Sequence, residues 1–316
     1  MAAPEIVLDW RGLPDRLRGS SVAIGNFDGV HVGHVAVLRA AHAARPDLPL
    51  AALTFEPHPR EHFRPEDPPF RLTLLPAKAR ALAAAGARIV YAVRFDAALA
   101  ALEAEEFVEQ VLHRGVGAKH LACGADFAFG HRRGGDVAFL GRAAEARGIG
   151  LTVVPHVADA SGPISSSRIR RVLQDGYPER AARKLGRWWE IWGVVSHGDK
   201  RGRLLGFPTA NIALNGHLEP ARGVYAVRVR LPDGRVVDGV ANIGRRPTVE
   251  GTELRVEAHL FDFSGDLYGQ EIAVGLVSYL RPEQRFASLD ELRAQIAADS
   301  AAARAALAAA GTAAPG

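Results

Sequence analysis

The stretch GNFDGVHVGH, residues 25–34, decides the fold of the first half of the chain. It follows a short apolar run at 22–24 and precedes a helical pattern at 35–44, so it reads as a link between a strand and a helix. Unpaired amides at the start of a helix favour an anion. Gly29 and Gly33 allow the backbone to come close to a ligand. The stretch therefore predicts an anion site in an α/β fold.

Two histidines, His31 and His34, lie beside that expected anion site. Imidazole rings can donate hydrogen bonds to a phosphate, and donors placed in advance stabilise charge that develops on its oxygens. The sequence contains no GxxxxGK[ST] string, which a P-loop requires. The histidines are three residues apart, whereas a zincin needs them four apart. We expect phosphate handlers; the alternative is a loop whose histidines only cap the helix and pack.

Apolar runs and helical patterns alternate along the first half of the chain, which predicts an α/β domain with a parallel sheet. The expected strands are 21–27, 49–55, 88–95, 119–127 and 149–157, and the expected helices are 35–44, 76–86, 105–115 and 136–148. Ligands of such Rossmann-like sheets bind beyond the carboxyl ends of the strands.

The second half is rich in strand patterns, which predicts an antiparallel barrel. Expected strands lie within 189–198, 223–244, 253–263 and 271–280, with a hairpin turn at Asp233-Gly234. A helix follows, with a capping box between Ser288 and Glu291. The expected domains are 1–185 and 186–305, followed by an Ala-rich tail over 306–316 that frays.

Composition limits the class of protein. The chain has 316 residues, enough for two domains, and its net charge is +4. Only four of its 39 basic residues are lysines, and no long block of like charge occurs, so we expect no nucleic-acid partner. The single cysteine, Cys123, excludes an internal disulfide and a cysteine-based zinc site, and fits a reducing compartment. No secretory leader or membrane span is apparent, so we expect a cytoplasmic protein.

Taken as a whole, GNFDGVHVGH resembles the HxGH signature of the nucleotidyltransferase superfamily. Its longer form resembles the adenylyltransferase half of bacterial bifunctional riboflavin kinase/FMN adenylyltransferases, also called FAD synthetases. Further family-like blocks are TFEPHP (54–59), PPFRLT (68–73), GADFAFGHRRGGD (124–136) and ISSSRIRRVLQDG (164–176). Two positions depart from the family: Ser167 replaces a threonine and keeps the hydroxyl, and Ala128 replaces a larger residue, often arginine, which bears on flavin contacts.

The resemblance implies that His31 and His34 bind ATP phosphates and stabilise the transition state. It also implies a nucleotide or flavin site lined by Gly25, Asn26, Phe27, Asp28, Gly33 and Asp126. Ser165, Ser166 and Ser167 precede Arg168 at an expected helix start. Hydroxyls and amides there suit a phosphate that the arginine clamps in a fork. The alternative is a serine cap beside a solvated arginine.

A second group of polar residues lies in RGRLLGFPTANI, residues 201–212. Thr209 and Asn211 are two apart, so in an extended segment they face the same way. Their oxygens suit Mg²⁺, which usually keeps waters and substrate phosphates as further ligands. Gly202 and Gly206 allow a close loop.

The strand pattern ELRVEAHLFDF holds a candidate base, Glu257. Val256, Ala258 and Leu260 form one face of this strand, and Glu257 lies on the other with Arg255 and His259. A carboxylate there can accept a proton from a substrate hydroxyl. The alternative is an ion pair with a neighbouring cation.

The blocks GRLLGFPTANI, GVYAV (223–227), VANIGRRPT (240–248), VEAHLFDFSGDLYGQ (256–270) and LRPEQRF (280–286) resemble the riboflavin kinase domain, in its order. That resemblance implies a six-stranded antiparallel barrel plus a helix. It implies that Thr209 and Asn211 hold Mg-ATP and that Glu257 is the general base on the ribityl 5′-hydroxyl. Gly202, Gly206 and Pro208 then belong to the nucleotide loop, and Arg285 touches the flavin.

We therefore expect an enzyme that phosphorylates riboflavin to FMN and then adenylylates FMN to FAD, with ATP, riboflavin and FMN as substrates and Mg²⁺ as the metal. Three alternatives stay open: a riboflavin kinase whose adenylyltransferase half is inactive, a non-catalytic flavin- or RNA-binding regulator, and an adenylyltransferase for another phosphate-bearing acceptor. The sequence does not specify an oligomeric state.

Overall fold

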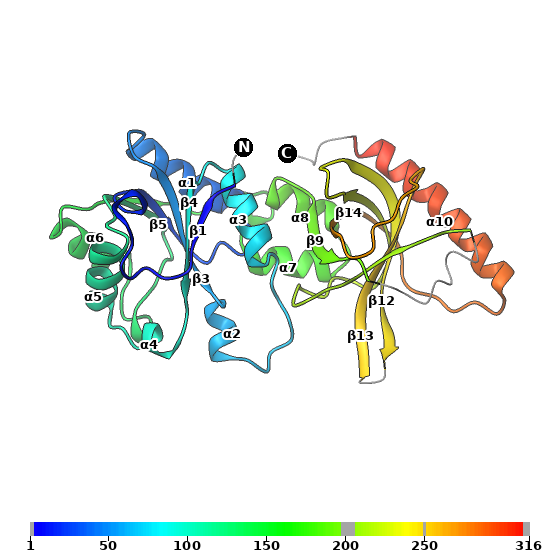
Figure 1. The fold of residues 1–316 in the computed structure, drawn as a ribbon, viewed down its shortest axis with the longest axis horizontal. Helices are drawn as coiled ribbons and strands as arrows, with labels where there is room; N and C mark the ends of the chain where they lie inside the picture. Colours follow the sequence, from blue (N-terminus) through cyan, green and yellow to red (C-terminus); the bar gives the residue numbers. More distant parts are fainter. Residues whose placement is uncertain (1–2, 197–205, 249–250, 312–316) are drawn as a thin grey trace. The chain divides into compact units, whose positions relative to one another are not determined.

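The fold was analysed in a computed structural model that describes residues 3–196, 206–248 and 251–311. The chain forms two compact units, whose elements are labelled in Figure 1. The first comprises Met1–Pro68 and Thr73–Ser165. The second comprises Pro69–Leu72 and Ser166–Gly316.

The first unit contains a six-stranded parallel sheet, as the alternating pattern predicts. Its strands are β1 (Glu5–Val7), β2 (Ser21–Ile24), β3 (Leu50–Glu56), β4 (Ile89–Arg94), β5 (His120–Gly124) and β6 (Gly150–Val154). They lie in the order β1-β4-β3-β2-β5-β6, and every pairing is parallel. The edge strand β1 was not expected from the sequence.

Helices cover both faces of this sheet. The helical elements of this unit are α1 (Val32–Ala44), α2 (Pro59–Phe63), α3 (Leu75–Ala84), α4 (Ala97–Ala100), α5 (Ala104–Glu106), α6 (Val137–Glu145), the π-helix η2 (Phe107–Gly115) and two 3₁₀ turns, η1 (Asp15–Leu17) and η3 (His131–Arg133). A short hairpin, β7 (Ala158–Asp159) and β8 (Gly162–Pro163), follows β6.

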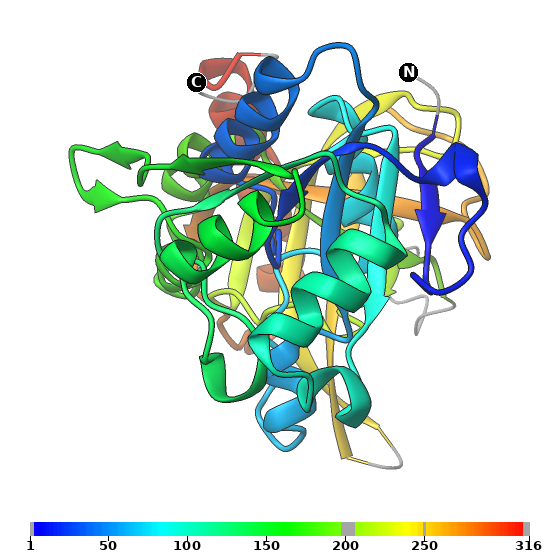
Figure 2. The ribbon, with the colours of Figure 1, turned by 90° about the vertical axis from the view of Figure 1, so that its left-hand side faces the viewer.

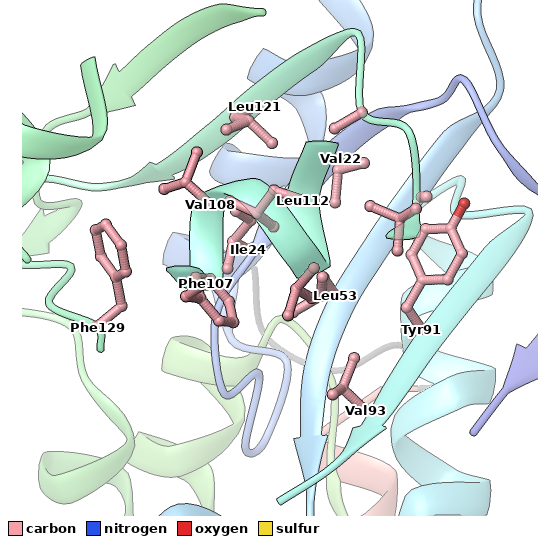
Figure 3. Close-up of a cluster of buried hydrophobic side chains, with 14 of the residues drawn as sticks. Val22, Ile24, Leu53, Tyr91, Val93, Phe107, Val108, Leu112, Leu121 and Phe129 are labelled. Atoms are coloured by element: carbon pink, nitrogen blue, oxygen red, sulfur yellow. The ribbon is translucent and has the colours of Figure 1, made fainter. Parts of the chain in front are cut away.

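Alternate strand residues divide the core of this unit into two layers. Val22 and Ile24 pack in the layer with η2 and α6, whereas Ala23 packs in the layer with α1 and α3. In Figure 3, Val22, Ile24 and Leu53 lie in one cluster with side chains of η2, and Figure 2 shows η2 crossing in front of the strands. The β2 segment is thus buried on both sides, which fixes the start of the loop that follows it.

The expected α-helix over 105–115 is in fact α5 followed by a π-helix, η2. Its buried residues, Phe107, Val108, Val111, Leu112 and Gly115, recur every four positions. Residues four apart lie on one face of a helix. The π-helix therefore presents one apolar face to the sheet.

The second unit contains a six-stranded antiparallel sheet in the order β10-β13-β12-β11-β14-β9. The strands are β9 (Trp189–Val194), β10 (Ala210–Ala213), β11 (Gly223–Arg230), β12 (Val236–Thr248), β13 (Gly251–Leu260) and β14 (Glu271–Arg281). The amide of Ser196 donates to the carbonyl of Asn211 at 2.9 Å, which joins the two edges of the sheet. The expected barrel and its β11–β12 hairpin are confirmed.

The barrel strands contribute to two hydrophobic clusters, one inside the barrel and one on its outer face. Ile212, Val227, Val256 and Ala258 belong to the inner cluster. The outer cluster packs against α10 (Leu289–Ala309), which runs along the barrel in Figure 1. Any side chain that alternates with the inner cluster therefore lies on the outer face, exposed unless α10 or a loop covers it.

Two helices that precede the barrel, α7 (Ser166–Gln174) and α8 (Pro178–Leu185), belong to its compact unit. Ile169, Leu173, Ala181 and Leu185 pack in the same cluster as the inner barrel residues. The expected boundary at 185–186 therefore differs from the boundary between compact units, which falls after Ser165. As a boundary between functional halves, 185–186 stays a prediction.

The expectation of a fraying tail is wrong as far as Ala309, because α10 continues to that residue. Ala303 and Leu307 are 0% and 2% exposed, since they contact the outer face of the barrel. The helix begins as expected at Ser288, whose hydroxyl accepts the amide of Glu291 at 3.2 Å. The Glu291 carboxylate accepts the amide of Ala287 rather than that of Ser288.

Across the described ranges, no helix combines the length and the apolarity that crossing a membrane requires.

We expect Leu307→Ala to destabilise the second unit by about 2–4 kcal/mol, because it empties a packed site between α10 and the barrel. Leu289→Ala is the matched control, since Leu289 is 69% exposed in the same helix. Urea unfolding followed by circular dichroism measures both. Equal small effects would show that α10 does not anchor the barrel.

Candidate functional site

The loop at 25–34 lies where the order of strands in the parallel sheet reverses. From β2 the chain continues to β3 and β4 on one side, and later to β5 and β6 on the other. The carboxyl ends of β2 and β5 therefore border the crevice where ligands of such sheets bind. The histidine loop follows β2, and the exposed Asp126 follows β5. The structure thus places both expected segments at one edge of the sheet.

The loop has an unusual backbone that few sequences tolerate. Phe27 and Val30 have φ of 49° and 41°, and Gly29 has φ of 84°. Left-handed backbone is strained for the two side-chain-bearing residues and is typical of functional sites. Thr73 holds the turn in place: its amide donates to Asp28 Oδ1, and its hydroxyl accepts the amide of Gly29, both at 3.0 Å. Asp28 is 1% exposed, so it acts here as a brace of the loop.

His31 and His34 cap the first turn of α1 reciprocally. The amide of His34 donates to His31 Nδ1, and the amide of His31 donates to His34 Nδ1, both at 3.3 Å. The rings stack with centroids 3.6 Å apart and planes 16° apart. Because an amide can only donate, both Nδ1 atoms are acceptors and carry no proton. Each neutral ring therefore carries its proton on Nε2.

That tautomer gives the pair its chemical character. Two parallel imidazoles each offer one N–H donor at Nε2, at the N-terminus of a helix whose dipole favours an anion. The alternative considered above, histidines that only cap and pack, is half right: they do cap. The cap also orients both donors in advance, which is what stabilisation of a phosphate transition state requires.

Gly33 is the residue that makes room for this cap. A Cβ at this position would lie 3.1 Å from both Cε1 and Nδ1 of His31. The φ of Gly33 is not left-handed, so the requirement is for space and not for backbone freedom. The glycine between the histidines thus permits the ring of His31 to fold back onto the helix.

The segment after β5 carries two aromatic residues that pack against the core of the first unit. Phe127 and Phe129 stack with centroids 5.4 Å apart, and Phe129 is buried. Ala128, between them, is partly exposed and places no long side chain there. Burial, together with the charge of Asp126, raises the pKa of the Cys123 thiol to about 11, so this cysteine is not a nucleophile.

The serine-arginine segment spans the division between the two units. Ser165 ends the first unit, and Ser166 begins α7 in the second. Ser167 and Arg168 are exposed, while the next residue, Ile169, is fully buried. The side chains of the first turn of α7 are therefore on its surface. Their approach to the histidine loop stays a prediction.

In the barrel, Thr209 and Asn211 lie together as their spacing predicts. The amide nitrogen of Asn211 donates to the hydroxyl of Thr209 at 3.4 Å and to its carbonyl at 3.3 Å. Since the nitrogen is used in this way, Oδ1 of Asn211 faces the other side of the amide. Asn211 is only 6% exposed, at the start of β10.

Glu257 lies on the outer face of β13, as the strand pattern predicts. Val256 and Ala258 on either side of it are 0% exposed in the inner core. Glu257 is directly opposite Asn211 of β10 and Asn242 of β12 in the strand register. Paired residues of antiparallel strands share a face, so these three form one polar row across the barrel.

The sequence did not indicate how the loop before β10 is fixed to this row. Nδ1 of His259 lies 2.8 Å from the carbonyl oxygen of Pro208, and its ring packs edge-on against Phe207 at 5.4 Å. His259 is two residues from Glu257 on the same face. This contact joins the segment that carries Thr209 to the strand that carries the candidate base.

Three further expected residues have less definite places. Gly206 has φ of +88° and is exposed at a turn. Arg285 is exposed between β14 and α10, and among the described residues no hydrogen bond or ion pair joins it to the polar row. Gly202 lies outside the described residues.

A basic cavity of about 260 Å³ lies at the opposite edge of the parallel sheet and is separate from this site. Its lining includes Arg18, Arg114, Lys119 and Arg147, where η2 and α6 end. Arg18 and Arg147 donate to the backbone carbonyls of Arg114 and Ala143, both at 2.8 Å. These cations lie at the negative ends of two helices, and Arg147 also pairs with Glu105 and Glu109.

A parallel α/β unit with a histidine-capped anion loop and a closed antiparallel barrel with a polar outer row define a nucleotide-dependent transferase of two parts. The first part matches the FAD synthetase family over residues 13–168, and the second matches the riboflavin kinase family over residues 185–307.

Relatives extend the likeness over nearly the whole chain. The bifunctional riboflavin kinase/FMN adenylyltransferase of Escherichia coli K12 is 44% identical over 288 residues, which is 90% of this chain and 92% of the relative. That of Pseudomonas fluorescens is 43% identical over 307 residues, 95% and 97% of the two chains. The chain belongs to the bifunctional riboflavin kinase/FMN adenylyltransferase family and carries both of its enzymatic domains.

A solved structure from Streptococcus pneumoniae, named a macrolide-efflux protein, has the same fold. It is 31% identical, with a TM-score of 0.84, and covers 96% of this chain and 99% of its own. Its name concerns that protein; the two domains identified here are those of flavin metabolism.

We expect Gly33→Ala to lower FMN adenylylation by about 10-fold or more, because the new methyl group displaces the His31 ring and its cap. Riboflavin phosphorylation by the same protein should be unchanged. Gly141→Ala in α6 is the control, since a Cβ there meets only Leu151 at an ordinary 3.7 Å. Chromatography of the flavin products measures both steps. Full FAD formation by Gly33→Ala would contradict the role of the cap.

Proposed function

We propose that the second unit transfers the γ-phosphoryl group of ATP to riboflavin, and that the first unit then joins AMP from a second ATP to the resulting FMN. The products are FAD and pyrophosphate. The observation that carries this proposal is the reciprocal histidine cap, which presents two Nε2–H donors at a helix N-terminus. The polar row of the barrel supplies the second chemistry on the same chain.

In the adenylyl transfer, a phosphate oxygen of FMN attacks the α-phosphorus of ATP. The bond from that phosphorus to the bridging oxygen breaks, and pyrophosphate leaves with the electron pair. No covalent enzyme intermediate is needed, so positioning and charge stabilisation supply the catalysis. His31 and His34 donate to oxygens that gain charge, and the N-terminal amides of α1 assist them.

The other residues of the first half take supporting roles in this proposal. The Gly25–Asp28 segment, Gly33 and Asp126 line the nucleotide and flavin site, and Ser165–Ser167 with Arg168 hold phosphate oxygens. The position of the loop and of Asp126 at the carboxyl edge of the sheet supports this assignment. Phe127, which is only partly buried, offers apolar surface for a flavin ring.

In the phosphoryl transfer, Glu257 accepts the proton of the ribityl 5′-hydroxyl as that oxygen attacks the γ-phosphorus, and ADP leaves. The outer-face position of Glu257, opposite Asn211, supports this role. Gly202, Gly206 and Pro208 form the loop over the nucleotide, and Arg285 contacts the flavin.

Thr209 and Asn211 fit a magnesium site that also needs substrate oxygens. They provide a hydroxyl and an amide oxygen, the neutral oxygen donors that Mg²⁺ accepts while it retains waters and phosphates. Among the described residues no cluster of three His, Cys, Asp or Glu side chains forms a self-sufficient metal site. Bound Mg²⁺ neutralises phosphate charge. The protein residues supply orientation and proton transfer.

The buried, unpaired Cys123 accords with a cytoplasmic enzyme.

His31→Ala and Glu257→Gln should separate the two activities. We expect His31→Ala to lower FAD formation by about 10²–10³-fold through loss of one transition-state donor, with FMN formation unchanged. Glu257→Gln should lower FMN formation by about 10²–10⁴-fold, while FMN supplied from outside is still adenylylated. Timed chromatography of flavins measures each step. Loss of both activities from either substitution, in a folded protein, would contradict the division of roles.

Asn211→Ala should raise the Mg²⁺ concentration that half-saturates the kinase step by about 10-fold or more, since one ligand is lost. The Mg²⁺ dependence of FMN adenylylation by the same variant is the internal control and should not change. A kinase rate that falls equally at every Mg²⁺ concentration would show that Asn211 is not a ligand.

A further inference from the structure

One charged side chain is completely buried in the first unit. Lys78 of α3 is 0% exposed, and its ammonium lies 2.7 Å from Oε1 of Glu56, whose side chain is 18% exposed. Glu56 is the last residue of β3, at the carboxyl edge of the sheet. Burial of an ion pair costs free energy that its attraction often fails to recover. Stability alone therefore does not explain the buried Lys78–Glu56 pair, and the other contacts of Lys78 indicate a further role.

The ammonium of Lys78 also reaches the hydroxyl of Thr54, 3.3 Å away. Thr54 is 0% exposed and lies two residues before Glu56, on the same face of β3. Because an ammonium group has donors and no acceptor, the Thr54 oxygen must accept from it. The hydroxyl proton is then directed away from Lys78.

That proton is donated to the backbone carbonyl of Asn26, 2.9 Å away. Lys78, Thr54 and Asn26 thus form a directed relay of hydrogen bonds, from a buried charge to the start of the histidine loop. A hydroxyl polarised by a cation is a stronger donor than one in a neutral setting. The relay fixes the Asn26 carbonyl, and with it the peptide plane that leads into Phe27.

Phe27 connects this plane to the catalytic rings. Its left-handed backbone, with φ of 49°, is held against an intrinsic preference for other conformations. Its ring packs edge-on against His34 with centroids 5.2 Å apart. A small rotation of the Asn26–Phe27 peptide would therefore move the side chain that supports His34.

We propose that Lys78, acting through Thr54, is a positioning residue for adenylyl transfer: it fixes the conformation of the histidine loop without touching substrate. This inference rests on the proposed function of His31 and His34. It differs from a purely structural role in one respect. Loss of the relay should change the turnover number of the folded enzyme, and not only the amount of enzyme that is folded.

Four variants test the proposal. Thr54→Val removes the hydroxyl at nearly constant shape, Thr54→Ser keeps it, Lys78→Met removes the charge, and the fourth combines Thr54→Val with Lys78→Met. The measurements are kcat and KM for FMN adenylylation, the rate of riboflavin phosphorylation, and the thermal midpoint of unfolding. The kinase rate of each variant is an internal control, because the second unit contains none of these residues.

We expect Thr54→Val and Lys78→Met each to lower kcat for adenylylation by about 10- to 100-fold, with a smaller effect on KM and none on the kinase rate. Thr54→Ser should stay within about twofold of the unchanged protein. Because both residues act through one relay, the double variant should lose no more kcat than the single variant with the larger loss.

Three results would overturn the proposal. The first is Thr54→Val with unchanged kcat and only a lower thermal midpoint, which indicates a structural role. The second is losses that multiply in the double variant, which indicates independent effects. The third is equal losses in Thr54→Ser and Thr54→Val. If Lys78→Met does not fold, the two Thr54 variants still decide. Absence of FAD formation by the unchanged protein would instead refute the proposed function.

Discussion

The reciprocal cap between His31 and His34 is the constraint on which the nucleotide-handling half depends. Two backbone amides that a helix leaves unpaired at its start are satisfied by two imidazole nitrogens. The same bonds favour rings that carry their proton on Nε2, the rings stack in parallel, and a glycine between them leaves room for the His31 ring. The four residues from His31 to His34 therefore both cap the helix and supply the expected phosphate donors. The sheet contributes the position of the loop, at the edge where strand order reverses.

In the barrel, strand alternation places the candidate site residues. Strand alternation sends apolar side chains inward and leaves a row of polar ones on the outer face, where Glu257 lies opposite Asn211. Beside the pairing of β10 with β13, the contacts of His259 with Pro208 and Phe207 hold the segment before the candidate metal ligands to the strand of the candidate base. The first unit positions its chemistry by strained backbone and caps, whereas the second positions it by strand register. The two halves thus perform related phosphate chemistry with unrelated structural means.

Much of this architecture follows from local patterns in the sequence. The alternation of Val256, Glu257 and Ala258 assigns each side chain to a face, because a strand repeats every two residues. The histidine loop could likewise be placed between a strand and a helix. The bonds that hold Asn26 to Thr54, and Asp28 to Thr73, join residues 28 and 45 positions apart. No local pattern encodes such contacts. The same limit explains why the burial of Leu307 in an alanine-rich segment was missed.

The proposed phosphate chemistry of the first unit depends on both histidines being neutral rings with the proton on Nε2. Nitrogen-15 spectra of the histidine side chains test it directly, with the two signals assigned by their loss in His31→Gln and His34→Gln. We expect, for both rings at neutral pH, a protonated Nε2 and an unprotonated Nδ1 that accepts a hydrogen bond. A proton on Nδ1 of either ring would be incompatible with the reciprocal cap, and the proposed pair of phosphate donors would have to be abandoned.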